Sequence, residues 1–199
     1  PFGDYAVVKD KDGYVNIRAK ESVKSKIVGT LPNNTLVYNL FDTTQNETGE
    51  EIFFNWIAVD KGYVHKSRLK MIGEFPSIGK GKEQGNSIII AGKGISVTLT
   101  RQPFDKTKHK ITKKKHKEYS EYIIDGKRVQ GLDNDEFLPK DHYKSITVTI
   151  NGKNIPIPKS AYDDLYEIGI WDTNNFAYYD KEDDILYIIA HNGDGANAY

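Results

Sequence analysis

The sequence contains no cysteine, and this absence removes several kinds of chemistry at once. A chain without cysteine forms no disulfide bonds, holds no metal through thiolates and offers no cysteine nucleophile to a substrate. The absence does not locate the protein, because such a chain is compatible with both reducing and oxidising compartments.

The chain also lacks a surplus of charge and any long apolar run. Its 199 residues include 28 Lys and Arg and 28 Asp and Glu, so the formal net charge is zero. General nucleic-acid binding needs a basic excess that displaces counterions from phosphates, so we expect no nucleic-acid partner. No apolar run reaches the roughly 20 residues that span a bilayer, so we expect no membrane span.

What the sequence does contain is a series of short runs of alternating polarity, rich in Tyr, Thr, Ile and Val. In the stretch 12–18 an Asp-Gly turn signal is followed by Val15 and Ile17 on one face of a predicted strand. Asn16 and Arg18 fall on the other face. Further runs of this kind lie at 5–8, 25–31, 35–40, 55–59 and 62–69.

Together these motifs resemble a bacterial Src-homology-3 domain. The motifs are Asp-Gly-Tyr-Val-Asn-Ile-Arg at 12–18, Ile-Val-Gly-Thr-Leu-Pro at 27–32, Asn-Trp at 55–56 and Gly-Tyr-Val-His-Lys-Ser-Arg-Leu at 62–69. Their order and spacing match along residues 5–72. The resemblance implies a small β-barrel in an exported protein. The remainder resembles, more loosely, the C-terminal part of secreted bacterial proteins that carry such a domain.

We therefore predict a mainly β protein with two domains. Residues 1–72 form the Src-homology-3-like barrel, residues 73–86 form a glycine-rich linker, and residues 87–199 form a β-rich (α+β) domain. The second domain is built from hairpins with one short helix.

Turn signals place four hairpins in the second domain. The paired runs are 87–90 with 95–100, 119–124 with 127–129, 145–150 with 153–158, and 176–179 with 185–190. The first three are joined by Gly-Lys-Gly, Asp-Gly and Asn-Gly, which are typical of tight hairpin turns. The stretch 160–166 is the best helix candidate, because Ser160 can cap its first turn.

The aromatic residues of the first domain allow two interpretations. The barrel needs aromatic residues for its core, and the candidates are Tyr14, Phe53 or Phe54, Trp56 and Tyr63. Trp56 and Tyr63 lie either in the core or at the barrel rim, or they form an exposed aromatic strip that contacts a ligand. The resemblance implies a ligand groove built from Tyr14, Asn16, Arg18, Trp56 and Tyr63. Aromatic faces would supply contact area, and Arg18 can pair with a carboxylate.

The segment 101–118 carries a dense run of positive charge. It is either a solvated loop or hairpin tip, or a docking patch for an acidic partner. An acid-rich partner within the same chain is also available at 160–199. The patch lysines are Lys106, Lys108, Lys110, Lys113, Lys114, Lys115 and Lys117.

The sequence offers little support for a metal, a cofactor or catalysis. No two histidines have the spacing of a zinc site, and the short acidic turns lack the length of a calcium loop. His191 and Asp194 can form an acid–base pair only if a nucleophile lies near them. We therefore expect no catalytic residues, no metal and no cofactor.

These observations favour a noncatalytic, exported binding protein that recognises cell-wall peptide (peptidoglycan) or a protein ligand through its N-terminal barrel. Two alternatives remain open: an inhibitor or immunity-type protein that docks on a partner enzyme through the second domain, and a cell-wall or sugar hydrolase that the barrel targets. The sequence begins Pro-Phe-Gly without a methionine, which is compatible with a removed signal peptide or lipid-anchored leader. We expect a periplasmic protein, an outer-membrane lipoprotein or a secreted protein.

Overall fold

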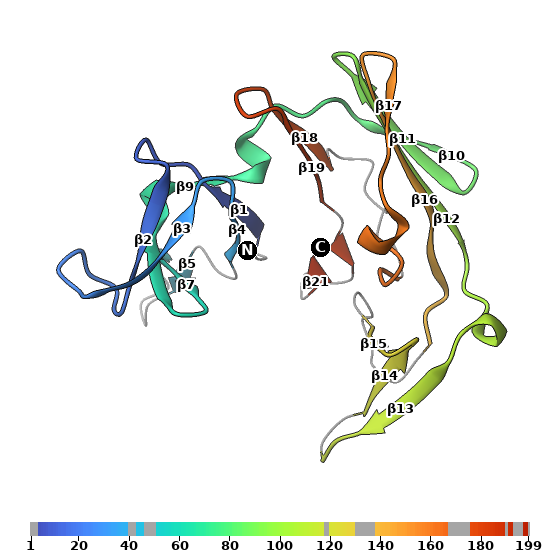
Figure 1. The fold of residues 1–199 in the computed structure, drawn as a ribbon, viewed down its shortest axis with the longest axis horizontal. Helices are drawn as coiled ribbons and strands as arrows, with labels where there is room; N and C mark the ends of the chain where they lie inside the picture. Colours follow the sequence, from blue (N-terminus) through green and yellow to red (C-terminus); the bar gives the residue numbers. More distant parts are fainter. Residues whose placement is uncertain are drawn as a thin grey trace. The chain divides into compact units, whose positions relative to one another are not determined.

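The computed structural model describes residues 4–39, 43–45, 51–117, 120–129, 138–166, 176–189, 191–192 and 197–198. The structure is mainly β, as predicted (Figure 1). Within the described residues the only helices are four 3-10 turns of three residues each. The chain divides into two compact units, Pro1–Phe75 and Pro76–Tyr199.

The first unit contains two main antiparallel sheets and a separate hairpin. The sheets have the strand orders β4-β1-β9 and β3-β2-β8-β7, and β5 pairs with β6. Among the described residues these sheets do not close into a barrel. The elements are β1 (Asp4–Val8), β2 (Tyr14–Arg18), β3 (Ile27–Pro32), β4 (Leu36–Asn39), β5 (Thr43–Gln45), β6 (Glu51–Phe53), β7 (Trp56–Val59), β8 (Gly62–His65), η1 (Lys66–Arg68), β9 (Leu69–Met71) and η2 (Ile72–Glu74).

The core of this unit is aliphatic in the part that the structure describes. Because side chains alternate along a strand, β2 buries Val15 and Ile17 while Tyr14 stays 46% exposed. The main cluster of buried residues is Val8, Val15, Ile17, Val37, Ile57 and Val64. Trp56 and Tyr63 are half-buried and are not part of this buried cluster, so a position at the rim or in a ligand strip stays a prediction for both. Phe54 is exposed, and the side chain of Phe53 lies outside the described residues.

The sequence predicts one strand over 62–69, and this prediction is wrong. β8 ends at His65, the turn η1 follows, and β9 begins at Leu69. β8 pairs with β7 and β2, whereas β9 pairs with β1. The turn exists because His65 Nδ1 accepts the backbone N–H of Ser67 at 3.2 Å, an alternative to a ladder hydrogen bond. It carries the chain from one sheet to the other.

The second unit is organised around a five-stranded antiparallel sheet with the order β10-β11-β12-β16-β17. Smaller sheets are β13-β14-β15, β18-β19 and β20-β21. The elements are β10 (Gly81–Gln84), β11 (Ser87–Gly92), β12 (Ile95–Pro103), η3 (Lys106–Lys108), β13 (Ile111–Lys115), β14 (Ser120–Ile124), β15 (Lys127–Arg128), β16 (Asp141–Ile150), β17 (Lys153–Ile155), η4 (Lys159–Ala161), β18 (Ala177–Asp180), β19 (Ile185–Ile188), β20 (His191–Asn192) and β21 (Asn197–Ala198).

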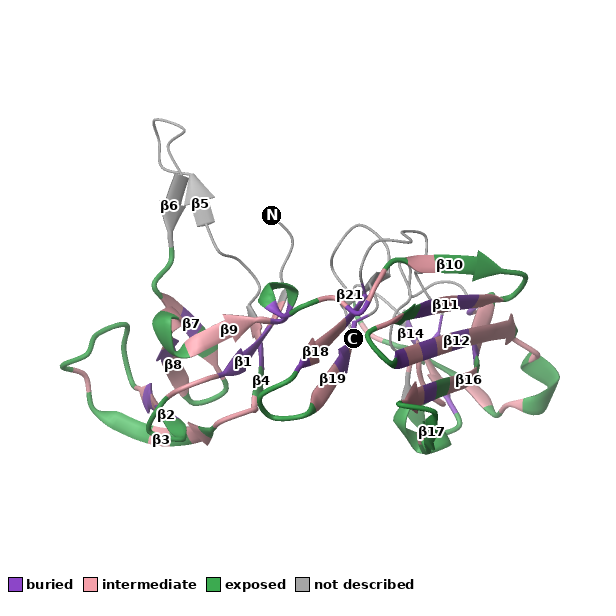
Figure 2. Ribbon diagram, turned by 90° about the horizontal axis from the view of Figure 1, so that it is seen from above, coloured by how far each residue is buried: buried purple, intermediate pink, exposed green. Residues whose placement is uncertain are grey.

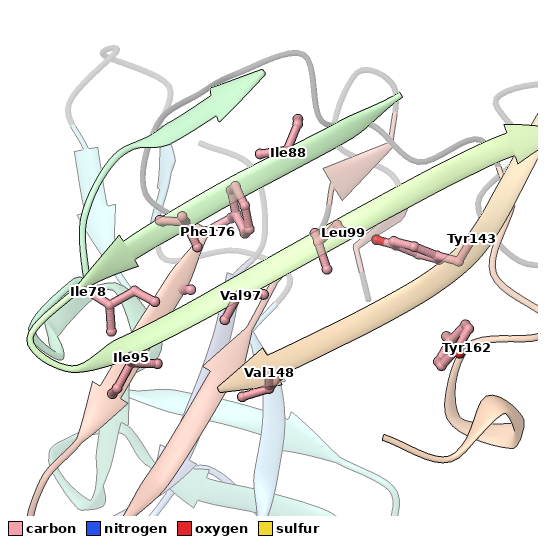
Figure 3. Packing of buried hydrophobic residues seen from close by; sticks show 11 residues of the cluster. Ile78, Ile88, Ile95, Val97, Leu99, Tyr143, Val148, Tyr162 and Phe176 are labelled. Carbon is pink, nitrogen blue, oxygen red and sulfur yellow. The ribbon is translucent and has the colours of Figure 1, made fainter. Parts of the chain in front are cut away.

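One face of the five-stranded sheet carries the hydrophobic core of the second unit. Figure 2 shows buried residues alternating with more exposed ones along β11 and β12. Ile90 and Val97 are fully buried, and Leu99 is 1% exposed. Residues from outside the sheet, such as Ile78 and Phe176, pack against this face (Figure 3).

The predicted linker at 73–86 is in part an ordered portion of the second unit. Residues 81–84 form β10, and Ile78 donates its backbone N–H to the Ala177 carbonyl at 3.1 Å. Gly79 of this segment and Gly92 of β11 allow the two segments to pack closely. A Cβ on Gly79 would lie 2.6 Å from the Ala91 carbonyl oxygen, and one on Gly92 would lie 1.9 Å from the Ile78 carbonyl oxygen.

The four predicted hairpins are confirmed. In the first three, both central turn residues have positive φ, as a tight I′ turn requires. These pairs are Lys93 (53°) with Gly94 (79°), Asp125 (53°) with Gly126 (84°), and Asn151 (48°) with Gly152 (78°).

The predicted helix at 160–166 is wrong. The structure has only η4 at its start, followed by turns, and Tyr166 forms a β-bridge with His142. A seven-residue helix is too short to be stable without tertiary support. Here the tertiary contacts favour another conformation, because Tyr162 and Tyr166 are both buried, in separate hydrophobic clusters.

Candidate functional site

The loop before β2 is fixed by a compact set of hydrogen bonds. The Asp10 carboxylate accepts a hydrogen bond from the backbone N–H of Asp12 at 2.9 Å. The backbone carbonyl of Asp10 accepts the N–H of Gly13 at 3.0 Å. The Asn33 side chain bonds both backbone groups of Asp10, accepting from its N–H and donating to its carbonyl at 2.9 Å each. These contacts hold the start of β2, and with it Tyr14, in place.

An ion pair joins this loop to η1. Arg68 Nη1 lies 2.8 Å from Asp10 Oδ2, and the Asp10 side chain is only 4% exposed. The N–H of Asp12, followed by the Arg68 guanidinium, holds the pKa of Asp10 below its usual value. The pair therefore connects two segments that are distant in the sequence.

This pKa shift predicts acid sensitivity of the first unit. Because the pKa of folded Asp10 is lowered, its ionised form stabilises the fold at pH values above about 4, and this contribution is lost as the pH falls through the lowered pKa. We expect Asp10→Asn to be less stable at neutral pH and to lose less stability on acidification. The measurement is the urea midpoint between pH 7 and pH 2, with Asp12→Asn as control. Identical acid profiles for wild type and Asp10→Asn would contradict the prediction.

Trp56 and His65 face each other across the β7–β8 ladder. They are paired in register, and their rings meet edge to face with centroids 5.0 Å apart. His65 Nδ1 is also 2.8 Å from Ser67 Oγ. Because Nδ1 already accepts the backbone N–H of Ser67, the neutral ring carries its hydrogen on Nε2. The contacts between His65 and Ser67 thus cap the turn η1.

Arg18 connects β2 to the polar arm at 19–26. Its Nη1 donates to the Ser25 carbonyl at 2.8 Å, and the N–H of Ala19 donates to the Lys26 carbonyl at 2.9 Å. A guanidinium group has five N–H donors, so this bond leaves capacity for a ligand carboxylate. Val23, at the tip of the arm, is 67% exposed.

These residues surround one hollow of about 250 Å³. It combines two aromatic side chains with cationic and anionic groups, which suits a small or extended polar ligand with some apolar surface. The lining residues are Asp10, Asp12, Tyr14, Val15, Asn16, Arg18, Val23, Trp56, His65, Ser67 and Arg68.

The structure brings together four of the five residues of the predicted groove: Tyr14, Asn16, Arg18 and Trp56. Tyr63 pairs with Arg18 in the β2–β8 ladder, but it does not line the hollow. Among the lining residues that the sequence argument missed, His65 was the easiest to find. Counting outward from the turn between β7 and β8 places it opposite Trp56.

The seven lysines of the predicted docking patch are all exposed. Lys106 and Lys108 lie in η3, Lys113, Lys114 and Lys115 in β13, and Lys110 and Lys117 beside that strand. Residues 111–115 are therefore strand rather than loop. Two of the lysines form ion pairs: Lys108 with Asp105 at 3.1 Å and Lys114 with Glu121 at 3.6 Å.

A cluster of rings packs the sheet β13-β14-β15 against β12 and β16. Phe104 stacks on His109 with centroids 4.7 Å apart, and His142 lies parallel to Tyr166 at 6.2 Å. Burial lowers the pKa of His142 and raises the pKa of Tyr166 to about 12. His109 Nδ1 lies 2.7 Å from Asp125 Oδ2, and this bond lowers the pKa of Asp125. The cluster is part of the packing of this unit.

The structure adds little to the hydrolase alternative. His191 belongs to β20, whereas Asp194 lies outside the described residues. In the described part of the chain, no group of three or more histidine, aspartate and glutamate side chains is placed to hold a metal ion. Nor does any helix there have the length and apolarity to traverse a bilayer.

Comparison with protein-family models, with curated proteins and with solved structures finds no match for this chain.

Proposed function

We propose that the protein is a noncatalytic, exported binding protein whose first unit is a Src-homology-3-like module. The module recognises an extended peptide, either from the cell wall or from a protein. The observation that carries the proposal is the gathering of Tyr14, Asn16, Arg18 and Trp56 around one hollow.

The chemistry of the hollow favours a peptide that carries both charges. Arg18 can donate to a carboxylate, while Asp12, in the loop before β2, can accept from an amine. The exposed face of Tyr14 and the half-buried Trp56 supply apolar contact beside these charges. Short wall peptides have this mixture of free carboxylates, amines and small apolar side chains.

The hollow also limits the size of what enters it. A volume of about 250 Å³ is just below the usual range of roughly 300–1,000 Å³ for ligand sites and accommodates one or two residues. The rest of an extended ligand would run along the surface, beside the arm at 19–26. We therefore expect modest affinity that depends strongly on a few side chains.

Sedimentation with purified peptidoglycan tests the proposal. We expect the whole protein to cosediment, and Trp56→Ala and Arg18→Ala each to reduce binding about tenfold, because buried aromatic and arginine anchors dominate such interfaces. Lys24→Ala is the matched control, since Lys24 lies in the same arm, is exposed and does not line the hollow.

Two results would contradict the proposal. If wild type does not bind peptidoglycan and a library of short peptides also gives no binding, the module has no peptide ligand of this kind. If binding occurs but Trp56→Ala and Arg18→Ala bind like wild type, the ligand lies elsewhere.

A further inference from the structure

β13 is an edge strand of the second unit. It pairs with β14 alone among the described residues, in the strand order β13-β14-β15 (Figure 1). An edge strand presents a row of unpaired N–H and C=O groups on its outer side. Such a row can bind another extended chain.

The ladder identifies which residues direct their backbone groups outward. The N–H of Asp125 donates to the Lys110 carbonyl, so this pair is hydrogen-bonded across the two strands. In an antiparallel ladder hydrogen-bonded and non-hydrogen-bonded pairs alternate. Thr112 and Lys114 therefore bond to β14, whereas Ile111, Lys113 and Lys115 point their N–H and C=O groups to the outer edge. The bond from Val129 N–H to the Tyr122 carbonyl supports this assignment, because it turns Tyr122 toward β15.

Both faces of this edge carry positive charge. Lys113 and Lys115 lie on one face of the strand, and Lys110 and Lys114 lie on the other, because successive side chains alternate. All four are exposed. The Lys113 ammonium lies 5.3 Å from the centre of the Tyr122 ring, which keeps it on its own face of the sheet.

The charge pattern restricts which chain can pair with this edge. Lysines on an edge strand repel a second copy of the same strand. They make no favourable charge interaction with an uncharged strand. Carboxylates directly opposite lysines are favourable cross-strand partners. An extended segment with consecutive Asp or Glu residues would place carboxylates against lysines on both faces.

We propose that β13 is a docking edge for an extended acidic segment of a partner protein. The segment adds a strand beside β13, with backbone hydrogen bonds to Ile111, Lys113 and Lys115. Its carboxylates contact the lysines on the two faces. The outward row of N–H and C=O groups favours a polypeptide over a nucleic acid or an anionic polysaccharide, because only a polypeptide offers the matching row. The inference is independent of the hollow in the first unit.

The first test uses a probe peptide with blocked ends, Thr-Val-Glu-Glu-Glu-Glu-Val-Thr, and the whole protein. We expect amide hydrogen exchange by NMR to show new protection at Ile111, Lys113 and Lys115 on addition of the peptide. We also expect the dissociation constant to rise with salt and at least about tenfold in the double variant Lys113→Glu/Lys115→Glu.

The matched control is Lys82→Glu/Lys153→Glu, which makes the same change of charge. These two lysines are exposed on β10 and β17, the edges of the five-stranded sheet. We expect the control to bind the probe like wild type. Equal weakening in both double variants would overturn the proposal, because it would show attraction to the overall charge alone.

A second comparison separates strand pairing from charge. Lys113→Gln removes the charge, and Lys113→Pro removes the charge together with the outward N–H, which an edge strand tolerates. With folding of both variants verified by circular dichroism, we expect Lys113→Pro to bind more weakly than Lys113→Gln. Equal binding would overturn the strand-addition geometry. No binding of the probe to wild type, or protection by heparin equal to that by the peptide, would overturn the proposal as a whole.

Discussion

Replacing Leu99 with alanine is expected to lower the free energy of unfolding of the second unit by about 2–5 kcal/mol. Leu99 is 1% exposed and lies on β12, between Ile88 of β11 and Ile146 of β16. Strands on both sides hold its surroundings in place, so the cavity left by the shorter side chain collapses only in part. The loss is therefore expected in the upper part of that range.

Hydrogen exchange of the backbone amides in β11, β12 and β16 measures this effect. We expect their protection to fall by roughly two to three orders of magnitude, since each 1.4 kcal/mol is a factor of ten. Thr98→Ala is the control, because Thr98 is the neighbouring residue on the opposite, half-buried face of the same strand. Similar losses in the two variants would show that the core does not lie on the face described.

Gly62→Ala is expected to destabilise the first unit and to displace Arg18. Gly62 has φ 154°, and a Cβ there would lie 2.2 Å from the Arg18 carbonyl oxygen and 3.2 Å from Ile17 Cγ2. A backbone carbonyl cannot move aside as a flexible side chain can, so β8 and β2 must separate. We expect a cost of about 2–4 kcal/mol from the clash and the unfavourable φ together, and weaker binding at the hollow that Arg18 lines.

Gly13→Ala provides the matched comparison in the same unit. Gly13 also has positive φ, 81°, but a Cβ there would meet no heavy atom within 4 Å. Only the conformational cost remains, about 1–2 kcal/mol. Urea unfolding followed by Trp56 fluorescence, in a background with Trp171→Phe, compares the two variants. If both lose the same stability, the close approach of β8 to β2 is not what requires Gly62.

The hairpins were the most predictable part of the fold, because their signals are local. Asp125-Gly126 and Asn151-Gly152 each place two residues that tolerate positive φ between alternating runs, and the structure has the expected turns there. The same local logic predicts that Val15 and Ile17 share one face of β2, and in the structure both are buried.

The errors arise where distant contacts decide the local structure. Gly79 looks like a flexible linker residue in the sequence, but it allows its backbone to approach that of Ala91 in β11. Ser160 is a good helix cap, but the burial of Tyr162 and Tyr166 outweighs the weak preference of a short segment for a helix. Neither contact can be read from neighbouring residues.

The candidate site was predictable in part for the same reason. Tyr14, Asn16 and Arg18 share one face of a single strand, and Trp56 lies opposite His65 in a simple hairpin. By contrast, Arg68 reaches Asp10 across 58 positions in the chain. A pair so widely separated leaves no local signal in the sequence. The contribution of Arg68 and Asp10 to the lining of the hollow is therefore visible only in the structure.

The chain leaves the five-stranded sheet at Pro103 and returns to it at Asp141, and these two residues are paired in the β12–β16 ladder. Everything between them, including β13, is thus an excursion from two adjacent strand ends. Because the entropy of closing a loop grows only slowly with its length, the sheet sets little restriction on the size of this excursion. The excursion that carries the lysines of β13 can therefore change in length or sequence while the five-stranded sheet stays the same.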